Sequence, residues 1–97
     1  RRIPFANMIY VGDGMTDIPC MRLVLEKGGS SIAIYNQASP KSLQDVRKLL
    51  KDQRVNYCAP ADYREDSAME ALVELILDRI AARVQLQKFE EIQVQSR

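Results

Sequence analysis

Apolar and polar residues follow two different spacings along this chain, and the alternation predicts strands separated by helices. Short, mostly apolar runs predict strands at residues 7–12, 31–35 and 54–58. Between and after these runs, apolar residues recur every three or four positions, as they do on one face of an amphipathic helix. The predicted order is therefore strand, helix, strand, helix, strand, helix.

Local signals mark the ends of the first two predicted helices. Thr16 is the expected N-cap of the first helix, and the pair Gly28-Gly29 ends it, because glycine readily takes the left-handed conformation found there. Ser39 followed by Pro40 predicts an N-cap and first residue for the second helix.

The last predicted helix opens with a capping box formed by Ser67 and Glu70. We expect it to reach about residue 87, or to continue further as a protruding tail. Its period is 3.6 residues, which favours a helix packed on a sheet over a coiled coil. The predicted apolar face consists of Ala71, Leu72, Leu75, Ile76, Ile80 and Val84.

This alternation of strands and helices predicts an α/β fold with parallel strands. In such sheets, ligands bind beyond the carboxyl ends of the strands. Asp13 occupies that place, directly after the first predicted strand.

The composition of the chain limits the partners and the catalytic groups that can be expected. The chain has 97 residues, which suggests one small domain, and its net charge of +1 gives no reason to expect nucleic acid or an acidic membrane surface as a partner. No apolar run approaches the ~20 residues that span a bilayer, and nothing marks the chain as secreted, so we expect a cytoplasmic protein. Histidine is absent, so any catalysis must use carboxylates, lysine, hydroxyls or a hard metal ion.

The stretch IYVGDGMTDIP, residues 9–19, carries two carboxylates on one tight turn. Asp13 and Asp17 are expected to project into the same space. The repulsion between their two negative charges would then be relieved by a bound proton, by a bound cation or by a larger separation. Mg²⁺ suits such a site because it commonly takes few carboxylates together with phosphate oxygens and water. A helix N-terminus beside Thr16 would favour a phosphate nearby.

The spacing of the residues alone is also consistent with purely structural roles for this turn. Asp-Gly is ordinary turn chemistry, and Asp17 could simply cap a helix or interact with its dipole. An EF-hand fits less well, because the loop lacks oxygen ligands at alternating positions and a closing glutamate. A nucleotide-binding loop is also disfavoured, since the stretch has neither GxGxxG spacing nor a P-loop lysine.

The stretch YVGDGMTDIPCMRLV strongly resembles the last motif of the haloacid dehalogenase-like (HAD) phosphohydrolases, in its GDGxTDxP form. The similarity continues through SIAIY and RVNYCAPADY to the final helix and covers nearly the whole chain. Within that family, the chain looks like uncharacterised bacterial HAD hydrolases that resemble phosphoserine phosphatases. The resemblance implies that Asp13 binds Mg²⁺, that Asp17 supports the metal site, often through water, and that Gly14 and Thr16 face the substrate.

The same resemblance implies that residues 1–97 are only the C-terminal half of a Rossmann-like HAD core. The family's nucleophile lies in a DxD stretch, which this sequence lacks, and the substrate-selecting cap is also missing. We therefore expect a longer parent enzyme that hydrolyses a small phosphomonoester through an aspartyl-phosphate, and a chain that is inactive alone. Without its neighbouring strand, residues 7–12 would form an apolar edge, so we expect self-association or pairing with the missing half. The alternative is a non-catalytic HAD-like module used for binding or assembly.

Overall fold

The computed structural model describes residues 3–13 and 15–95 of the chain. Within this part, three parallel strands form one sheet in the order β1-β2-β3. The strands are β1 (Ile9–Gly12), β2 (Ser30–Tyr35) and β3 (Tyr57–Pro60). The α-helices are α1 (Ile18–Glu26), α2 (Pro40–Lys51) and α3 (Ala68–Gln95), with 3₁₀ turns at Phe5–Asn7 and Met15–Asp17.

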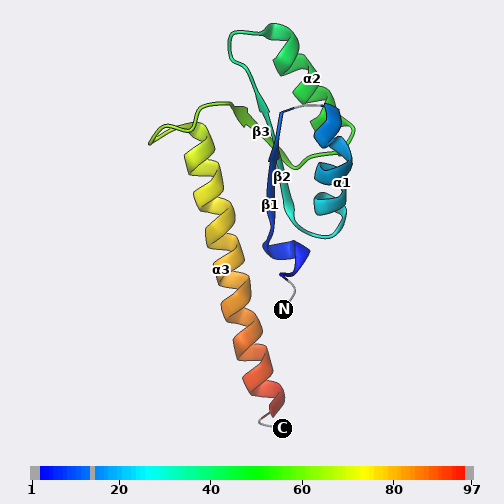
Figure 1. Cartoon of the computed structure of the whole chain (residues 1–97). Helices are drawn as coiled ribbons and strands as arrows, with labels where there is room; N and C mark the ends of the chain where they lie inside the picture. Colours follow the sequence, from blue (N-terminus) through cyan, green and yellow to red (C-terminus); the bar gives the residue numbers. More distant parts are fainter. Residues whose placement is uncertain (1–2, 14, 96–97) are drawn as a thin grey trace.

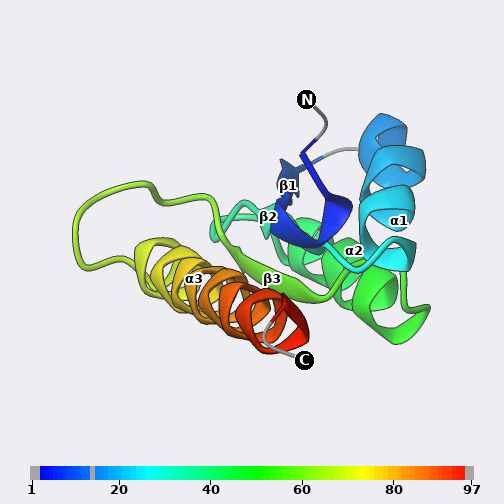
Figure 2. The same cartoon turned by 90° about the horizontal axis from the view of Figure 1, so that it is seen from below.

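Helices cover both faces of the sheet. The helices α1 and α2 lie together on one face, and α3 runs along the other (Figures 1 and 2). Each of the first two helices connects one parallel strand to the next, as the alternation of elements predicted. An α/β fold with three parallel strands alternating with helices is thereby confirmed.

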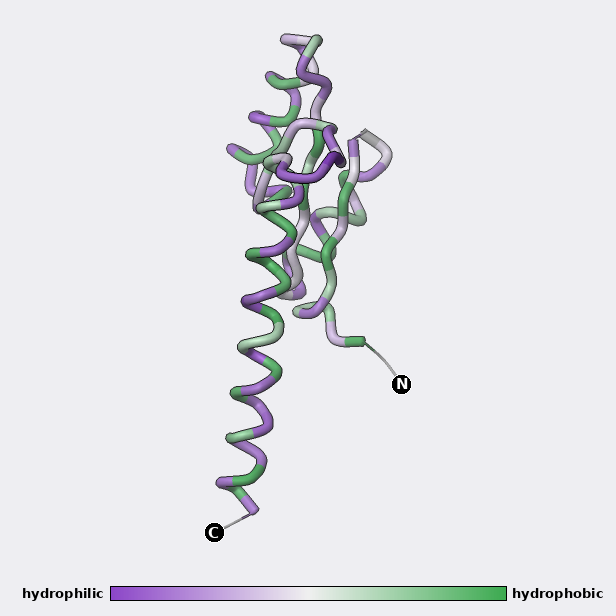
Figure 3. The backbone as a smooth tube through the Cα atoms, turned by 90° about the vertical axis from the view of Figure 1, so that its left-hand side faces the viewer, coloured by the Kyte–Doolittle hydropathy of each residue, from purple (hydrophilic) through white to green (hydrophobic). Residues whose placement is uncertain are grey.

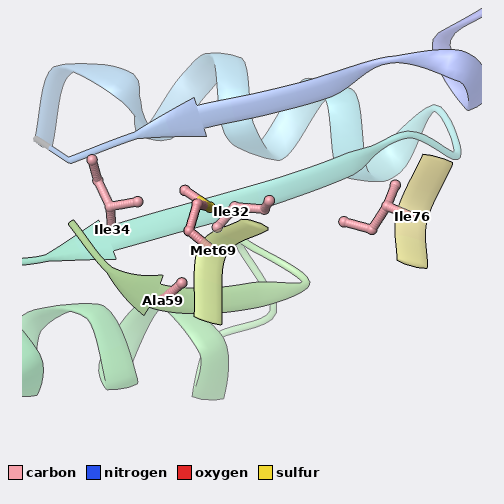
Figure 4. Close-up of a cluster of buried hydrophobic side chains, with 5 residues drawn as sticks. All are labelled: Ile32, Ile34, Ala59, Met69 and Ile76. Carbon is pink, nitrogen blue, oxygen red and sulfur yellow. The ribbon is translucent and has the colours of Figure 1, made fainter. Parts of the chain in front are cut away.

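Two apolar clusters fill the spaces between these layers. The cluster on the α3 side is built from Ile32, Ile34, Ala59, Met69 and Ile76 (Figure 4). The cluster on the α1 and α2 side is built from Met21, Ala33, Val46 and Val55. Successive residues of β2 point alternately into the two clusters, because side chains of a strand alternate between the faces of a sheet. The central strand is therefore buried on both sides.

The first strand and the first helix both begin later than predicted. Residues 5–7 form a 3₁₀ turn, in which Asn7 N–H donates to Pro4 O, and pairing with β2 starts at Ile9. A second 3₁₀ turn precedes α1, so the N-cap position falls on Asp17 and not on Thr16. The 3₁₀ turn inserts extra residues between strand and helix, which the N-cap preference of threonine does not reveal.

The third strand lies further along the chain than residues 54–58. Asn56 both donates to Ser31 O through its backbone N–H and accepts from Ser31 N–H through its side-chain Oδ1. These two bonds close the end of the ladder, and regular pairing begins at Tyr57 and continues to Pro60. A proline is tolerated at this position because β3 lies at the sheet edge, where its missing donor interrupts no central ladder.

The second and third helices begin as the capping signals predicted. Ser39 accepts a hydrogen bond from Ser42 N–H at the start of α2, and Ser67 accepts one from Glu70 N–H at the start of α3. The return bond of the capping box is displaced by one residue, because Glu70 accepts from the N–H of Asp66.

The last helix continues to Gln95, well past the sheet (Figure 1). Its packed face differs in part from the predicted one: Leu75 is 68% exposed, whereas Met69 and Val73 contact the sheet. Beyond Val84, apolar and polar residues interleave along the helix, as the hydropathy colouring of the tube shows (Figure 3). Residues 85–95 are all exposed. The protruding tail is confirmed. No helix of the described chain has both the length and the apolar character that crossing a bilayer requires.

Candidate metal centre

The candidate site is the loop that joins β1 to α1. The strand ends at Gly12, Asp13 follows immediately, and Asp17 closes the 3₁₀ turn that leads into α1. Asp13 therefore lies at the carboxyl end of a parallel strand, the edge of the sheet where such folds bind ligands. Gly14, which the sequence predicted to face a substrate, lies outside the described residues.

The carboxylate of Asp17 accepts hydrogen bonds from Tyr10 and from Asp13. The hydroxyl of Tyr10 donates to Oδ1 over 3.0 Å, and the backbone N–H of Asp13 donates to Oδ2 over 3.2 Å. Both donors come from β1 or the residue that follows it. The 3₁₀ turn thus folds Asp17 back onto the end of the strand, next to the backbone of Asp13.

Gly12 leaves the space that this arrangement needs. A Cβ atom at Gly12 would approach the Asp17 side chain to 2.7–2.9 Å, which is closer than real contacts allow. The glycine at this position is therefore explained by the Asp17 side chain, which lies against the strand backbone.

The contact with Asp17 also changes the chemistry of Tyr10. Its hydrogen bond to the Asp17 carboxylate, with smaller contributions from burial and the Cys20 side chain, raises the pKa of Tyr10 from 10.0 to about 12. The phenol stays protonated at neutral pH and acts there as a hydrogen-bond donor to the aspartate.

One structural alternative for Asp17 is not observed. Asp17 stands at the N-cap position of α1, but its side chain makes no capping hydrogen bond to that helix. Its carboxylate instead turns toward Tyr10 and the Asp13 backbone. A capping role therefore does not account for the aspartate at this place. Thr16 is exposed within the 3₁₀ turn, and its role toward a substrate stays a prediction.

The donor set fits part of a magnesium site. Asp13 is exposed at the strand end, and the Asp17 carboxylate accepts hydrogen bonds from Tyr10 and from the Asp13 backbone. Residues 3–13 and 15–95 contain no group of three or more Asp, Glu, Cys or His residues placed to hold a metal together. Mg²⁺ is suited to such a sparse set, because it commonly keeps several waters and binds one or two carboxylates plus phosphate oxygens.

A small cavity of about 160 Å³ adjoins Asp13. Its floor is apolar, and Ser42 and Asp45 from the first turns of α2 join Asp13 among its polar residues. Sequence analysis did not single out Ser42 or Asp45. The only signal for them was their place in the first turns of a helix that follows a strand, at the ligand-binding edge of the sheet.

Residues of the loop after β3 form hydrogen bonds with one another. Asp62 accepts hydrogen bonds from the backbone and the guanidinium of Arg64, whose side chain lowers the pKa of Asp62 from 3.8 to about 2. The hydroxyl of Tyr57 accepts from Arg79, and Tyr63 is exposed. These contacts are those of a structural turn and of helix packing.

Tyr10 is a further residue of this site that was not expected from the sequence. Within a strand, residues two apart face the same side of the sheet, so Tyr10 lies on the side where Gly12 leaves room for Asp17. The sequence alone therefore predicts that Tyr10 and Gly12 face the same side of the sheet. It does not predict the 3₁₀ turn that returns the chain and brings Asp17 within reach of the Tyr10 hydroxyl.

Comparison with known proteins identifies no function. No family model matches the chain, and no solved structure matches it. The chain is similar to an uncharacterized protein of Borreliella burgdorferi, with 26% identity over 87 residues. The alignment covers 87% of this chain but 28% of the relative, so the chain spans less than a third of that protein's length.

Proposed function

We propose that this chain is the C-terminal part of the core of a HAD-type, Mg²⁺-dependent phosphohydrolase. The observation that carries the proposal is the pair of aspartates in the loop after β1, with Asp13 exposed at the strand end and Asp17 held against the strand. The sequence Gly-Asp-Gly-Met-Thr-Asp that forms this loop is the stretch that resembles the last HAD motif. The parallel α/β fold is compatible with that assignment.

Each residue of the loop has a role in this proposal. Asp13 would bind Mg²⁺ directly, and Asp17 would support the metal site beside it. Thr16 and Gly14 face the phosphorylated substrate. When bound, Mg²⁺ screens the negative charge of the phosphoryl oxygens.

Catalysis in this proposal belongs to a longer parent protein. A nucleophilic aspartate outside this chain would attack the phosphorus of the phosphomonoester, which breaks the P–O ester bond, releases the alcohol and leaves an aspartyl-phosphate. Water would then hydrolyse the aspartyl-phosphate to the free aspartate and inorganic phosphate. The sequence has no DxD stretch to supply that nucleophile, so the chain alone is inactive. We place the parent enzyme in the cytoplasm.

The sheet supports the idea that another segment completes the fold. Within residues 3–13 and 15–95, β1 pairs with β2 alone and lies at an edge of the sheet. An unpaired strand offers a row of backbone donors and acceptors that a further strand can satisfy. In the proposed parent, the strand that carries the nucleophile lies along this edge of β1.

The test is a phosphatase assay of the longest open reading frame that contains this chain, produced as one protein. We expect hydrolysis of p-nitrophenyl phosphate that requires Mg²⁺ and is lost in Asp13→Asn. Asp52→Asn, which removes an exposed carboxylate at the C-terminal end of α2, is the matched control and should keep full activity.

Two results would overturn the proposal. One is Mg²⁺-dependent hydrolysis that Asp13→Asn leaves intact, because the activity would then arise elsewhere. The other is an inactive protein whose upstream sequence contains no strand ending in DxD. That second result would favour the binding or assembly module instead.

A further inference from the structure

Tyr10 reaches the candidate metal centre from the strand that precedes it. Its hydroxyl donates to Oδ1 of Asp17 over 3.0 Å. We propose that Tyr10 is a positioning residue, whose hydroxyl holds the Asp17 carboxylate in the orientation that supports a divalent cation at Asp13. This inference rests on the proposed function and adds a residue to its site.

Packing fixes the ring that carries this hydroxyl. Tyr10 lies on the α1 and α2 side of the sheet, where it contacts the buried cluster that contains Met21 and Ala33. A tyrosine ring has few rotatable bonds, so its packing determines where the hydroxyl lies. A phenylalanine ring at position 10 would fill the same space. Only the hydroxyl of Tyr10 can therefore account for an effect on Asp17.

Two donors on opposite oxygens restrict the carboxylate more than one donor can. The Asp13 N–H donates to Oδ2 and the Tyr10 hydroxyl donates to Oδ1, so each oxygen has a donor that opposes rotation of the carboxylate about its Cβ–Cγ bond. A carboxylate oxygen can accept more than one hydrogen bond, so the bond from the Tyr10 hydroxyl is compatible with a further bond to a cation or its waters.

A purely structural role for the hydroxyl is the competing explanation. In that case Asp17 only satisfies a half-buried phenol, and removal of the hydroxyl would alter stability without changing cation affinity. Partners that orient metal-supporting groups behave differently, since their loss typically weakens metal binding by about 10–100-fold. Cation affinity therefore separates the two explanations.

The experiment is an NMR titration of the 97-residue chain with Mn²⁺, whose paramagnetic broadening of nearby amide signals detects affinities as weak as millimolar. Four proteins are compared: the wild type, Asp13→Asn, Tyr10→Phe and the control Tyr35→Phe. Tyr35 is a partly buried strand tyrosine on the same face of the sheet. The amide spectra also report whether each variant is folded.

We expect broadening around Asp13 in the wild type and in Tyr35→Phe, its loss in Asp13→Asn, and about tenfold weaker binding in Tyr10→Phe. Hydrogen exchange of the Asp13 amide in the metal-free proteins gives a second readout. It should be faster in Tyr10→Phe than in Tyr35→Phe, because a looser carboxylate protects that N–H less well.

The two possible failures are distinguishable. Wild-type affinity and unchanged Asp13 exchange in Tyr10→Phe would overturn the positioning role and leave the metal site standing. Binding that is absent from the wild type, or unaffected by Asp13→Asn, would overturn the proposed metal site and this inference with it.

Discussion

The side chain of Asp17 lies directly over the backbone of Gly12. A Cβ atom added to Gly12 would lie 2.7 Å from Asp17 Cβ and 2.8 Å from its Cγ. The last residue of β1 and the last residue of the following 3₁₀ turn are therefore in mutual contact. Any side chain at position 12 would therefore clash with Asp17 in its observed position.

Gly12→Ala should destabilise the protein through this contact. The added methyl group must displace Asp17, and overpacking of this kind typically costs about 1–3 kcal/mol. Urea denaturation measures the free energy of unfolding. In an Asp17→Gly background, which removes the obstructing atoms, the same substitution should cost much less. An equal cost in both backgrounds would show that the strain at Gly12 arises elsewhere.

A second prediction concerns Arg79, which joins α3 to the sheet. Its guanidinium donates to Ser30 Oγ over 2.8 Å and to Tyr57 OH over 3.4 Å, and Ser30 is only 1% exposed. Arg79→Met keeps the aliphatic stem but leaves the buried serine hydroxyl without this donor. We expect a loss of about 1–3 kcal/mol in the free energy of unfolding.

Arg47→Met provides the matched control for this measurement, because Arg47 is an exposed arginine on α2. It should change the free energy of unfolding by no more than about 0.5 kcal/mol. If Arg79→Met also proved neutral in urea denaturation, the contacts of the helix with Ser30 and Tyr57 would contribute nothing to stability.

A third prediction concerns acid stability. The hydrogen bonds from Arg64 lower the pKa of Asp62 to about 2 in the folded protein, against 3.8 ordinarily. The ionised carboxylate therefore stabilises the fold above pH 3.8, and this contribution is lost as the pH falls from 3.8 toward 2. Because the ion pair is solvent-accessible, we expect a small effect.

Thermal denaturation of the wild type and Asp62→Asn at pH 6 and pH 2.5 measures this effect. The wild type should lose more of its thermal stability between the two pH values than the variant does. Asp66→Asn serves as the control, since Asp66 is an exposed aspartate in the same loop. Parallel pH dependence of the wild type and Asp62→Asn would exclude the Asp62–Arg64 pair as its cause.

The sequence predicted what depends on local signals and periodicity. The caps at Ser39 and Ser67 opened their helices as expected, because a side-chain oxygen satisfies a free N–H within three residues. The placement of Asp13 at the carboxyl end of β1 followed from the strand that precedes it. These features require only a few neighbouring residues and so can be read along the chain.

Contacts between segments were harder to predict. The start of β3 depends on Asn56 and its bonds to Ser31, which is 25 residues away in the sequence. The buried face of α3 depends on where the sheet meets it, so Leu75 is exposed although it matches the helical period. At the candidate site, the contact between Tyr10 and Asp17 likewise needs the turn that brings them together.

The last prediction concerns association of the chain in solution. β1 is an edge strand of the sheet, and the distal part of α3 exposes Phe89 and Ile92 by 65% and 60%. Unpaired strand edges promote pairing between chains, and exposed apolar side chains favour burial against a partner. We therefore expect the isolated chain to sediment at tens of micromolar as a species heavier than its monomer mass of 11.1 kDa.

Two charged variants distinguish the surfaces that could cause this association. Val11→Lys places a charge on the edge strand, whereas Phe89→Lys places one on the distal helix. Leu23→Lys on α1 is the control, because Leu23 is an exposed apolar residue that belongs to neither surface. The variant that restores a monomer identifies the surface, and a restored monomer in Val11→Lys alone would agree with an edge that a further strand covers in the parent protein. A wild-type chain that sediments as a sharp monomer would contradict the prediction for both surfaces.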